Sequence, residues 1–166
     1  KEDGYLETNI MVNGRLSPGY GGGVCQVSST LYNALLNTEA RILERHPHSG
    51  YSETTSYVPP GRDAAVSYGT KDLRFSFPTQ KVVIFAYLQD KNLICEIWGE
   101  KGNSLQKTWE TRVVSLEKRG EEEGLLTVET TVRNGEKIEY RYQDTYLIPW
   151  ELGQKIKEDF QNLGNK

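Results

Sequence analysis

The stretch GYGGGVCQVSSTLYNALL, residues 19–36, joins a run of glycines to a cysteine at the point where a helical pattern begins. A thiol is a weak nucleophile until it ionises, and the unpaired N–H groups and macrodipole at a helix start favour the thiolate. Cys25 is therefore a candidate nucleophile, with a small packing residue after a flexible glycine run as the alternative. Gly22 and Gly23 have no Cβ to obstruct a substrate carbonyl, and the backbone amides around Cys25 and Gln26 are candidate donors to an oxyanion.

The two histidines of the chain lie together in ERHPHSGY, at the end of a segment that alternates as a strand. A strand that returns from the helix can bring its end beside the helix start, so either imidazole is a candidate base for Cys25. His48 is the first choice, because Pro47 turns the chain out of the strand and an open loop follows. His46 is the second candidate, and a pair of surface histidines is the alternative to both.

A third residue would hold the imidazole in one orientation. Asp63, in the turn PPGRDAAV, is the first candidate for this position, and Glu44 is the second. The neighbouring Arg62 is a candidate to bind a substrate carboxylate through bidentate hydrogen bonds from its guanidinium, although an arginine in a turn is often only solvated.

The helix that carries the cysteine is predicted to have two distinct faces. The face expected to pack into the core is apolar at helical spacing and consists of Val24, Val27, Leu31 and Leu35. The face expected to carry chemistry consists of Cys25, Ser28, Ser29 and Tyr32. Ser29 and Tyr32 are therefore candidates to line a substrate pocket, with ordinary helix packing as the alternative.

The rest of the chain is dominated by strand patterns. Residues 73–100 alternate as a meander with a hairpin turn at 90–92, residues 54–68 predict two short strands, and Asn134-Gly135 is the clearest two-residue hairpin signal. A short terminal helix is predicted after Pro149, packing Trp150, Ile156 and Phe160. The fold class is therefore α+β, mainly antiparallel sheet with one principal helix that opens at the cysteine.

The second cysteine has a different setting. Cys95 shares one face of an alternating strand with Leu93 and Ile97, which is typical of a buried and inert thiol. A single disulfide between Cys95 and Cys25 is the alternative. His46, His48 and Cys25 would also offer three zinc ligands, but the sequence shows no obvious fourth, and we expect no metal site.

Composition limits the partners that this chain can have. Its 166 residues carry 20 basic and 23 acidic side chains, a net charge of −3, and the basic ones are scattered, so we expect no nucleic-acid binding. No apolar run approaches the roughly 20 residues of a membrane span. The chain begins with Lys1 rather than Met, so we expect it to be part of a longer protein.

Three segments together resemble the VanW domain family, which is named from a glycopeptide-resistance gene cluster. They are GGGVCQVSSTLYNALL, ERHPHS and YVPPGRDAAVSYGTKDLRF, and with the strand pair that follows they span roughly residues 9–100 in order. The resemblance implies a catalytic-like VanW domain over residues 1–100. Residues 101–166 carry no motif that can be placed, and we expect a β-rich C-terminal extension packed on that domain.

The resemblance also implies work at the cell surface of Gram-positive bacteria, outside the cytoplasm, because VanW-containing clostridial proteins look like L,D-transpeptidases that cross-link peptidoglycan. Cys25 matches the cysteine of the family and would be the nucleophile, His46 and His48 fall on its histidine stretch, and Arg62 and Asp63 fall on its Gly-Arg-Asp turn. We therefore expect 3-3 cross-linking of peptidoglycan stem peptides through a cysteine acyl-enzyme, without a cofactor. The alternatives are an L,D-carboxypeptidase, another cysteine peptidase of wall peptides, and a non-catalytic wall-binding module.

Overall fold

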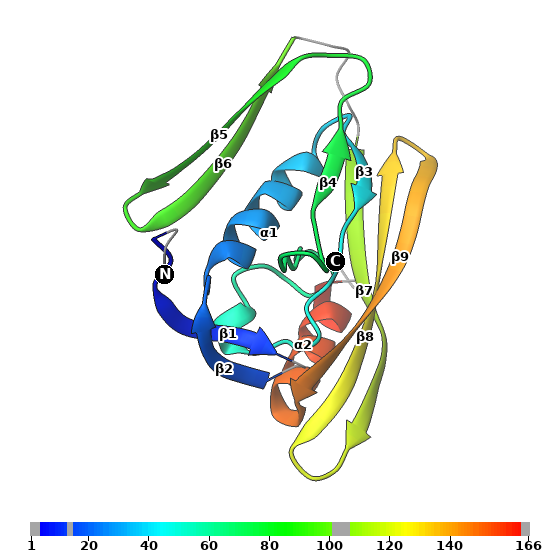
Figure 1. Ribbon diagram of the computed structural model, residues 1–166. Coiled ribbons are helices and arrows are strands. Elements are labelled where there is room, and N and C mark those ends of the chain that lie inside the picture. Colours follow the sequence, from blue (N-terminus) through cyan, green and yellow to red (C-terminus); the bar gives the residue numbers. More distant parts are fainter. Residues whose placement is uncertain (1–3, 13–14, 101–106, 164–166) are drawn as a thin grey trace.

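The computed structural model describes residues 4–12, 15–100 and 107–163 (Figure 1). In chain order its elements are β1 (Glu7–Val12), β2 (Arg15–Tyr20), α1 (Val24–Leu35), β3 (Arg41–Glu44), the short 3-10 helix η1 (Glu53–Thr55), β4 (Arg74–Ser76), β5 (Val82–Gln89), β6 (Asn92–Gly99), β7 (Lys107–Arg119), β8 (Glu123–Asn134), β9 (Lys137–Pro149) and α2 (Trp150–Leu163).

All strand pairs among the described residues are antiparallel and form small sheets. The pairs β1–β2, β3–β4 and β5–β6 are two-stranded, and β7, β8 and β9 make a three-stranded sheet in that order. Helix α1 lies between the β5–β6 hairpin and the larger sheet (Figure 1). This arrangement confirms the expected α+β fold with a principal helix that opens at the cysteine.

Local sequence signals placed several elements correctly. The β5–β6 turn has Asp90 at φ 49° and Lys91 at φ 67°, as a tight turn between twisted strands requires. The β8–β9 hairpin turns at Gly135, which adopts a φ of 57° that glycine reaches without steric cost. The predicted C-terminal helix is α2, and Ile156 and Phe160 pack it on the sheet.

The hydrophobic core joins the segments before and after residue 100. One buried cluster packs α2 on the sheet and consists of Tyr51, Leu126, Val128, Tyr146, Ile148 and Ile156. A second cluster packs α1 on the same sheet and consists of Tyr32, Leu36, Ala64 and Val132. Burying each large apolar side chain contributes roughly 1.5–3 kcal/mol. Packing on the β7–β9 sheet therefore stabilises α1 in its position.

Two predictions about local structure were wrong. Residues 73–100 do not form one meander, because β4 pairs with β3 and the β5–β6 hairpin forms a separate sheet. Residues 54–68 contain the end of η1 and loop rather than two short strands. In both cases the alternating pattern is present, but the pairing depends on segments that are distant in the sequence.

The predicted core face of α1 was wrong in part: Leu35 is buried as expected, and Val24 and Leu31 are half-buried. Val27 is 43% exposed, whereas Ser29 and Tyr32, expected on a separate chemical face, are 0% and 1% exposed. The face that carries Cys25, Ser29 and Tyr32 is the one that turns into the protein. Within the described residues, neither helix is long and apolar enough to cross a membrane.

Candidate active site

The glycine run positions Cys25 in the first turn of α1. Gly23 is the N-cap and has a φ of 97°, a left-handed conformation that favours glycine, and a Cβ there would meet open space. Gly22 was expected to admit a substrate, but a Cβ on it would lie 2.6 Å from the carbonyl oxygen of Asn9 in β1. Gly22 is therefore needed for close packing against β1, and only Gly23 leaves room beside Cys25.

The backbone amides at the helix start differ in their availability. The Gln26 N–H donates to the carbonyl of Gly23 at 3.0 Å, so the prediction that it is free to bind an oxyanion was wrong. No acceptor for the Cys25 N–H is found among the described residues. The Cys25 N–H is thus the donor available to a charged oxygen that forms beside the sulfur.

The inward face of α1 binds the loop that follows Arg62. The Ser29 hydroxyl accepts a hydrogen bond from the Ala64 N–H at 2.9 Å, and the Ser28 hydroxyl donates to the Ala64 carbonyl at 2.6 Å. Further along the loop, the Val66 N–H donates to the Cys25 sulfur at 3.4 Å. Helix and loop are therefore locked together at the residues that flank Asp63.

These contacts correct the expected roles of two helix residues. Ser29 is fully buried and serves to hold the loop, and the Tyr32 hydroxyl shares a 2.7 Å hydrogen bond with the Tyr142 hydroxyl. Neither side chain reaches the surface, so the prediction that they line a substrate pocket was wrong.

The chain around His48 is held on both sides by backbone hydrogen bonds. On one side the Ala65 N–H donates to the His46 carbonyl at 2.8 Å. On the other side the Leu147 N–H of β9 donates to the Ser49 carbonyl at 3.0 Å, and the Tyr51 N–H donates to the Leu147 carbonyl at 2.9 Å. The segment 46–51 is thus fixed between the loop that contains Asp63 and strand β9 at the edge of the larger sheet.

This clamp brings His48 onto Asp63, as the sequence predicted for the first-choice residues. One oxygen of the Asp63 carboxylate lies 2.6 Å from His48 Nδ1 and also accepts the His48 backbone N–H at 2.7 Å. Because Nδ1 is taken, Nε2 is the ring nitrogen left to interact with Cys25, and each of the two groups shifts the pKa of the other. The side chains follow the order Cys25, His48, Asp63, which is the arrangement of a nucleophile, a base and its orienting acid.

A buried polar network that sequence reasoning missed holds Asp63 in place. The other oxygen of Asp63 accepts hydrogen bonds from Arg45 at 2.8 Å and from the Tyr146 hydroxyl at 2.6 Å. Arg45 also pairs with Asp144 at 2.5 Å and lies over the ring of Tyr142. No local motif marks Tyr146 or Asp144, and the one available signal for Arg45 was a charged residue in a strand that ends at the histidines.

The second choices for base and orienting acid pair with each other instead. His46 Nε2 lies 3.0 Å from the Glu44 carboxylate, and the His46 side chain is 38% exposed. His46 and Glu44 therefore pair with each other at the partly exposed end of β3, and no contact of either with Cys25 is found among the described residues. The described residues also contain no group of three or more His, Cys, Asp or Glu side chains placed to hold a metal ion.

The electrostatics of the group favour an ion pair between sulfur and imidazole. Burial raises the pKa of Cys25, but hydrogen bonds from His48 and from the Val66 amide outweigh it, and the net pKa lies below that of an ordinary thiol. Burial lowers the pKa of His48, but its hydrogen bonds to Asp63 and Cys25 raise it to about 9. Burial also opposes ionisation of Asp63, yet His48 and the Arg45 charge hold its pKa below the usual range.

Arg62 is not placed for the expected contact with a substrate carboxylate near Cys25. Its guanidinium lies 3.2 Å from the centroid of the Trp109 ring, and its buried Nε has no hydrogen-bond partner among the residues that the structure describes. Its carbonyl accepts a hydrogen bond from Asn33, which lies eight residues beyond Cys25 and thus about 12 Å along the helix.

Cys95 also departs from expectation. It is half-buried rather than buried, and both cysteines are free, so no disulfide joins them in this structure. Burial raises the pKa of Cys95, which leaves its thiol less reactive than that of Cys25.

A family model described as VanW like protein matches residues 1–98, more than half of the chain. The chain belongs to the VanW family. The protein named vancomycin B-type resistance protein VanW, from Enterococcus faecalis (strain ATCC 700802 / V583), is 31% identical over 104 residues, which are 61% of this chain and 38% of that protein. The uncharacterized protein YoaR of Bacillus subtilis (strain 168) is 49% identical over 75 residues, 45% of this chain and 24% of YoaR.

These VanW relatives are longer than the part they share with this chain, which spans less than half the length of each. No solved structure gives a significant match. The VanW match ends at residue 98, yet Asp144 and Tyr146 lie beyond it and contact Arg45 and Asp63. In this VanW protein the β9 strand thus completes the polar network behind the candidate site.

Proposed function

We propose that this protein is a peptidoglycan L,D-transpeptidase that forms 3-3 cross-links through a Cys25 acyl-enzyme. The observation that carries the proposal is the grouping of Cys25, His48 and buried Asp63: His48 lies 2.6 Å from Asp63, the thiol pKa is lowered by His48, and the imidazole pKa is raised by Asp63 and Cys25. The substrate class is supported by the resemblance to VanW-containing transpeptidases and by a relative named for vancomycin resistance. Such work would place the protein outside the cytoplasm.

In the acylation step, the Cys25 thiolate attacks the carbonyl carbon between the third stem residue and its terminal D-alanine. The charged oxygen that forms accepts the Cys25 N–H. The carbon–nitrogen bond then breaks while His48 gives the proton of its imidazolium to the departing amine. Free D-alanine leaves, and the stem tripeptide remains on the sulfur as a thioester.

In the transfer step, the side-chain amine of the third residue in a neighbouring stem attacks the thioester carbonyl. Neutral His48 takes the proton from this amine, the carbon–sulfur bond breaks, and the thiolate is restored beside the imidazolium. The product is an amide between two third residues. If water attacks instead, the product is a tripeptide stem, which is the carboxypeptidase alternative.

The reaction is tested by incubating the protein with disaccharide-tetrapeptide muropeptides and analysing products and intact protein by mass spectrometry. We expect released D-alanine, a stem adduct on Cys25 and dimeric muropeptides linked between third residues. Tripeptide products without dimers would assign the carboxypeptidase reaction. Intact muropeptides and an unmodified Cys25 would contradict any acyl transfer and favour a wall-binding module.

The pH dependence of the reaction follows from the two shifted groups. The thiolate is present above the lowered pKa of Cys25 and is lost as the pH falls through it, and the imidazolium is lost as the pH rises through about 9. We therefore expect kcat/KM for D-alanine release to be bell-shaped, with its basic limb near pH 9. A profile that only rises through pH 9 to an alkaline plateau would show that the thiol is not activated by His48.

His46 gives a prediction of a small effect. Because it pairs with Glu44 at the surface, His46→Gln should leave kcat/KM within about twofold of wild type and lower the free energy of unfolding by less than about 1 kcal/mol. Rates of D-alanine release and a urea titration would measure both effects. A loss of activity as large as that of His48→Gln would show that His46 takes part in catalysis and would contradict the assignment of His48 as the base.

A further inference from the structure

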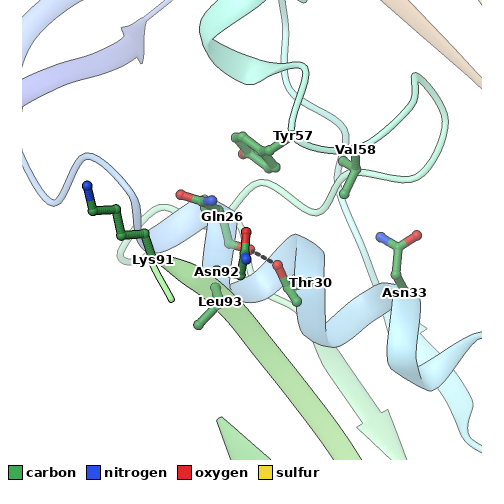
Figure 2. A pocket seen from close by; sticks show the side chains of 8 residues that line it. All are labelled: Gln26, Thr30, Asn33, Tyr57, Val58, Lys91, Asn92 and Leu93. Atoms are coloured by element: carbon green, nitrogen blue, oxygen red, sulfur yellow. Dashed lines mark hydrogen bonds between the residues drawn. The ribbon is translucent and has the colours of Figure 1, made fainter. Parts of the chain in front are cut away.

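A groove runs along the exposed side of α1, next to the candidate site. It has a volume of about 450 Å³ and lies between α1, the loop after η1 and the tip of the β5–β6 hairpin (Figure 2). Its lining is mostly polar and consists of Gln26, Thr30, Asn33, Tyr57, Val58, Lys91, Asn92 and Leu93. We call it the α1 groove.

One end of the α1 groove adjoins the nucleophile. Gln26 is the residue after Cys25, and Tyr57 faces it across the groove (Figure 2). Burial raises the pKa of Tyr57 to about 12, with smaller increases from the charges of Cys25 and Asp63 and a decrease from a hydrogen bond with Ser29. A peptide in the groove would thus have one end beside Cys25.

The length of the α1 groove matches a short extended peptide. It follows α1 from Gln26 to Asn33, which is seven residues or about 10 Å along the helix axis. An extended chain covers at most about 3.3–3.6 Å per residue, so the groove spans about three residues. That is the length of the tripeptide that the proposed reaction transfers to Cys25.

The end of the groove near Cys25 carries a positive charge. Lys91, at the tip of the β5–β6 hairpin, lies on the Gln26 side, whereas Asn33 lies at the opposite end (Figure 2). Among the described residues no acidic side chain lines the groove, and Lys91 forms no ion pair with any of them. In a chain with more acidic than basic residues, an ammonium that has no ion pair within the described part of the chain marks a place for an anion.

We propose that Lys91 binds the free carboxylate of the residue that leaves from the acyl donor. This inference rests on the proposed function and adds how the protein would select its substrate. With the tripeptide along α1 and the scissile carbonyl at Cys25, the carboxylate of the terminal D-alanine lies one residue further on, on the side where Lys91 stands. The protein therefore selects stems that end directly after the scissile bond and discriminates against stems whose C-terminus is extended or amidated.

The test compares two probes, a disaccharide-tetrapeptide that ends in D-alanine and the same molecule with a C-terminal carboxamide. For wild type we expect kcat/KM to be roughly tenfold to a hundredfold lower on the amide, the range of a hydrogen bond to a charged group. Lys91→Gln should lower kcat/KM on the acid to about the wild-type value on the amide and should change the amide little. Lys91→Arg should restore most of the preference, and the matched control Lys155→Gln, on the exposed side of α2, should retain it.

A binding measurement separates this inference from the reaction itself. The Cys25→Ala variant cannot acylate, so calorimetry with the same two probes reports recognition alone. We expect the acid to bind more tightly than the amide by a similar factor, and the double variant with Lys91→Gln to bind both equally.

The outcomes distinguish the two proposals. Equal kcat/KM and equal affinity for acid and amide in wild type, or an equal loss on both probes in Lys91→Gln, would overturn the role of Lys91 while leaving the transpeptidase proposal intact. A preference for the acid in binding, with no D-alanine release by wild type, would support Lys91 and contradict the reaction. Neither binding nor turnover of either probe would overturn both.

Discussion

Cys25→Ala will abolish the stem adduct and lower D-alanine release by about a thousandfold or more, because the other described thiol, Cys95, has a pKa raised by burial and is not activated by His48. The substitution removes a half-buried sulfur whose hydrogen bonds to the Val66 backbone, at 3.4 and 3.5 Å, are weak because sulfur is a poor donor and acceptor, so the free energy of unfolding should fall by less than about 2 kcal/mol. Intact-protein mass spectrometry and a urea titration measure the two effects on the same preparation.

Cys95→Ala is the matched control for this experiment. Cys95 is also a free, half-buried thiol, but its pKa is raised by burial and it has no imidazole partner among the described residues. We expect Cys95→Ala to keep the stem adduct and to release D-alanine at close to the wild-type rate. An adduct that survives in Cys25→Ala and disappears in Cys95→Ala would show that Cys95 is the nucleophile and would contradict the mechanism proposed for Cys25.

Asp63→Asn should have the second largest effect and should act on both activity and stability. The amide cannot balance the imidazolium of His48, and its NH₂ group can stabilise the wrong tautomer, so kcat should fall by about a hundredfold to ten-thousandfold. Arg45 also loses one of its two buried carboxylate partners, which should lower the free energy of unfolding by about 2–4 kcal/mol. Turnover of muropeptides and chemical denaturation check these values.

Asp144→Asn separates the two roles of Asp63. Asp144 pairs with the same guanidinium and is equally buried, but it does not contact His48 in the structure. Asp144→Asn should therefore lower stability by less than Asp63→Asn, because Asp144 accepts fewer hydrogen bonds and burial raises its pKa, while it keeps most of the activity. If the two variants lose activity equally, Asp63 acts only by supporting the fold.

The pH profile gives a second readout for Asp63. The carboxylate raises the pKa of His48, so its replacement by an amide should lower that pKa and move the basic limb of kcat/KM to below pH 9. Asp144→Asn should leave this limb near its wild-type position. An unchanged basic limb in Asp63→Asn would contradict the pairing of Asp63 with a catalytic imidazolium.

The sequence alone was sufficient for features that depend on a few consecutive residues. The start of α1 after the glycines, the turns at Asp90-Lys91 and Gly135, and the terminal helix α2 all follow from local backbone preferences. The grouping of a helix-start cysteine with one of the chain's histidines also followed from sequence, because the chain holds only two of them.

Only the tertiary structure decided which of those residues meet and which face of α1 is covered. Helical periodicity shows that Cys25, Ser29 and Tyr32 share a face, but whether this face is buried depends on the loop at Ala64 and on β9, which are distant in sequence. The sequence favoured His48 over His46 because of Pro47 and the loop after it, but the backbone hydrogen bonds of this segment to Ala65 and Leu147, which hold His48 against Asp63, are not visible in alternation along a strand. Tyr146 and Asp144 entered the network for the same reason: long-range packing, rather than local pattern, brings their side chains to Arg45 and Asp63.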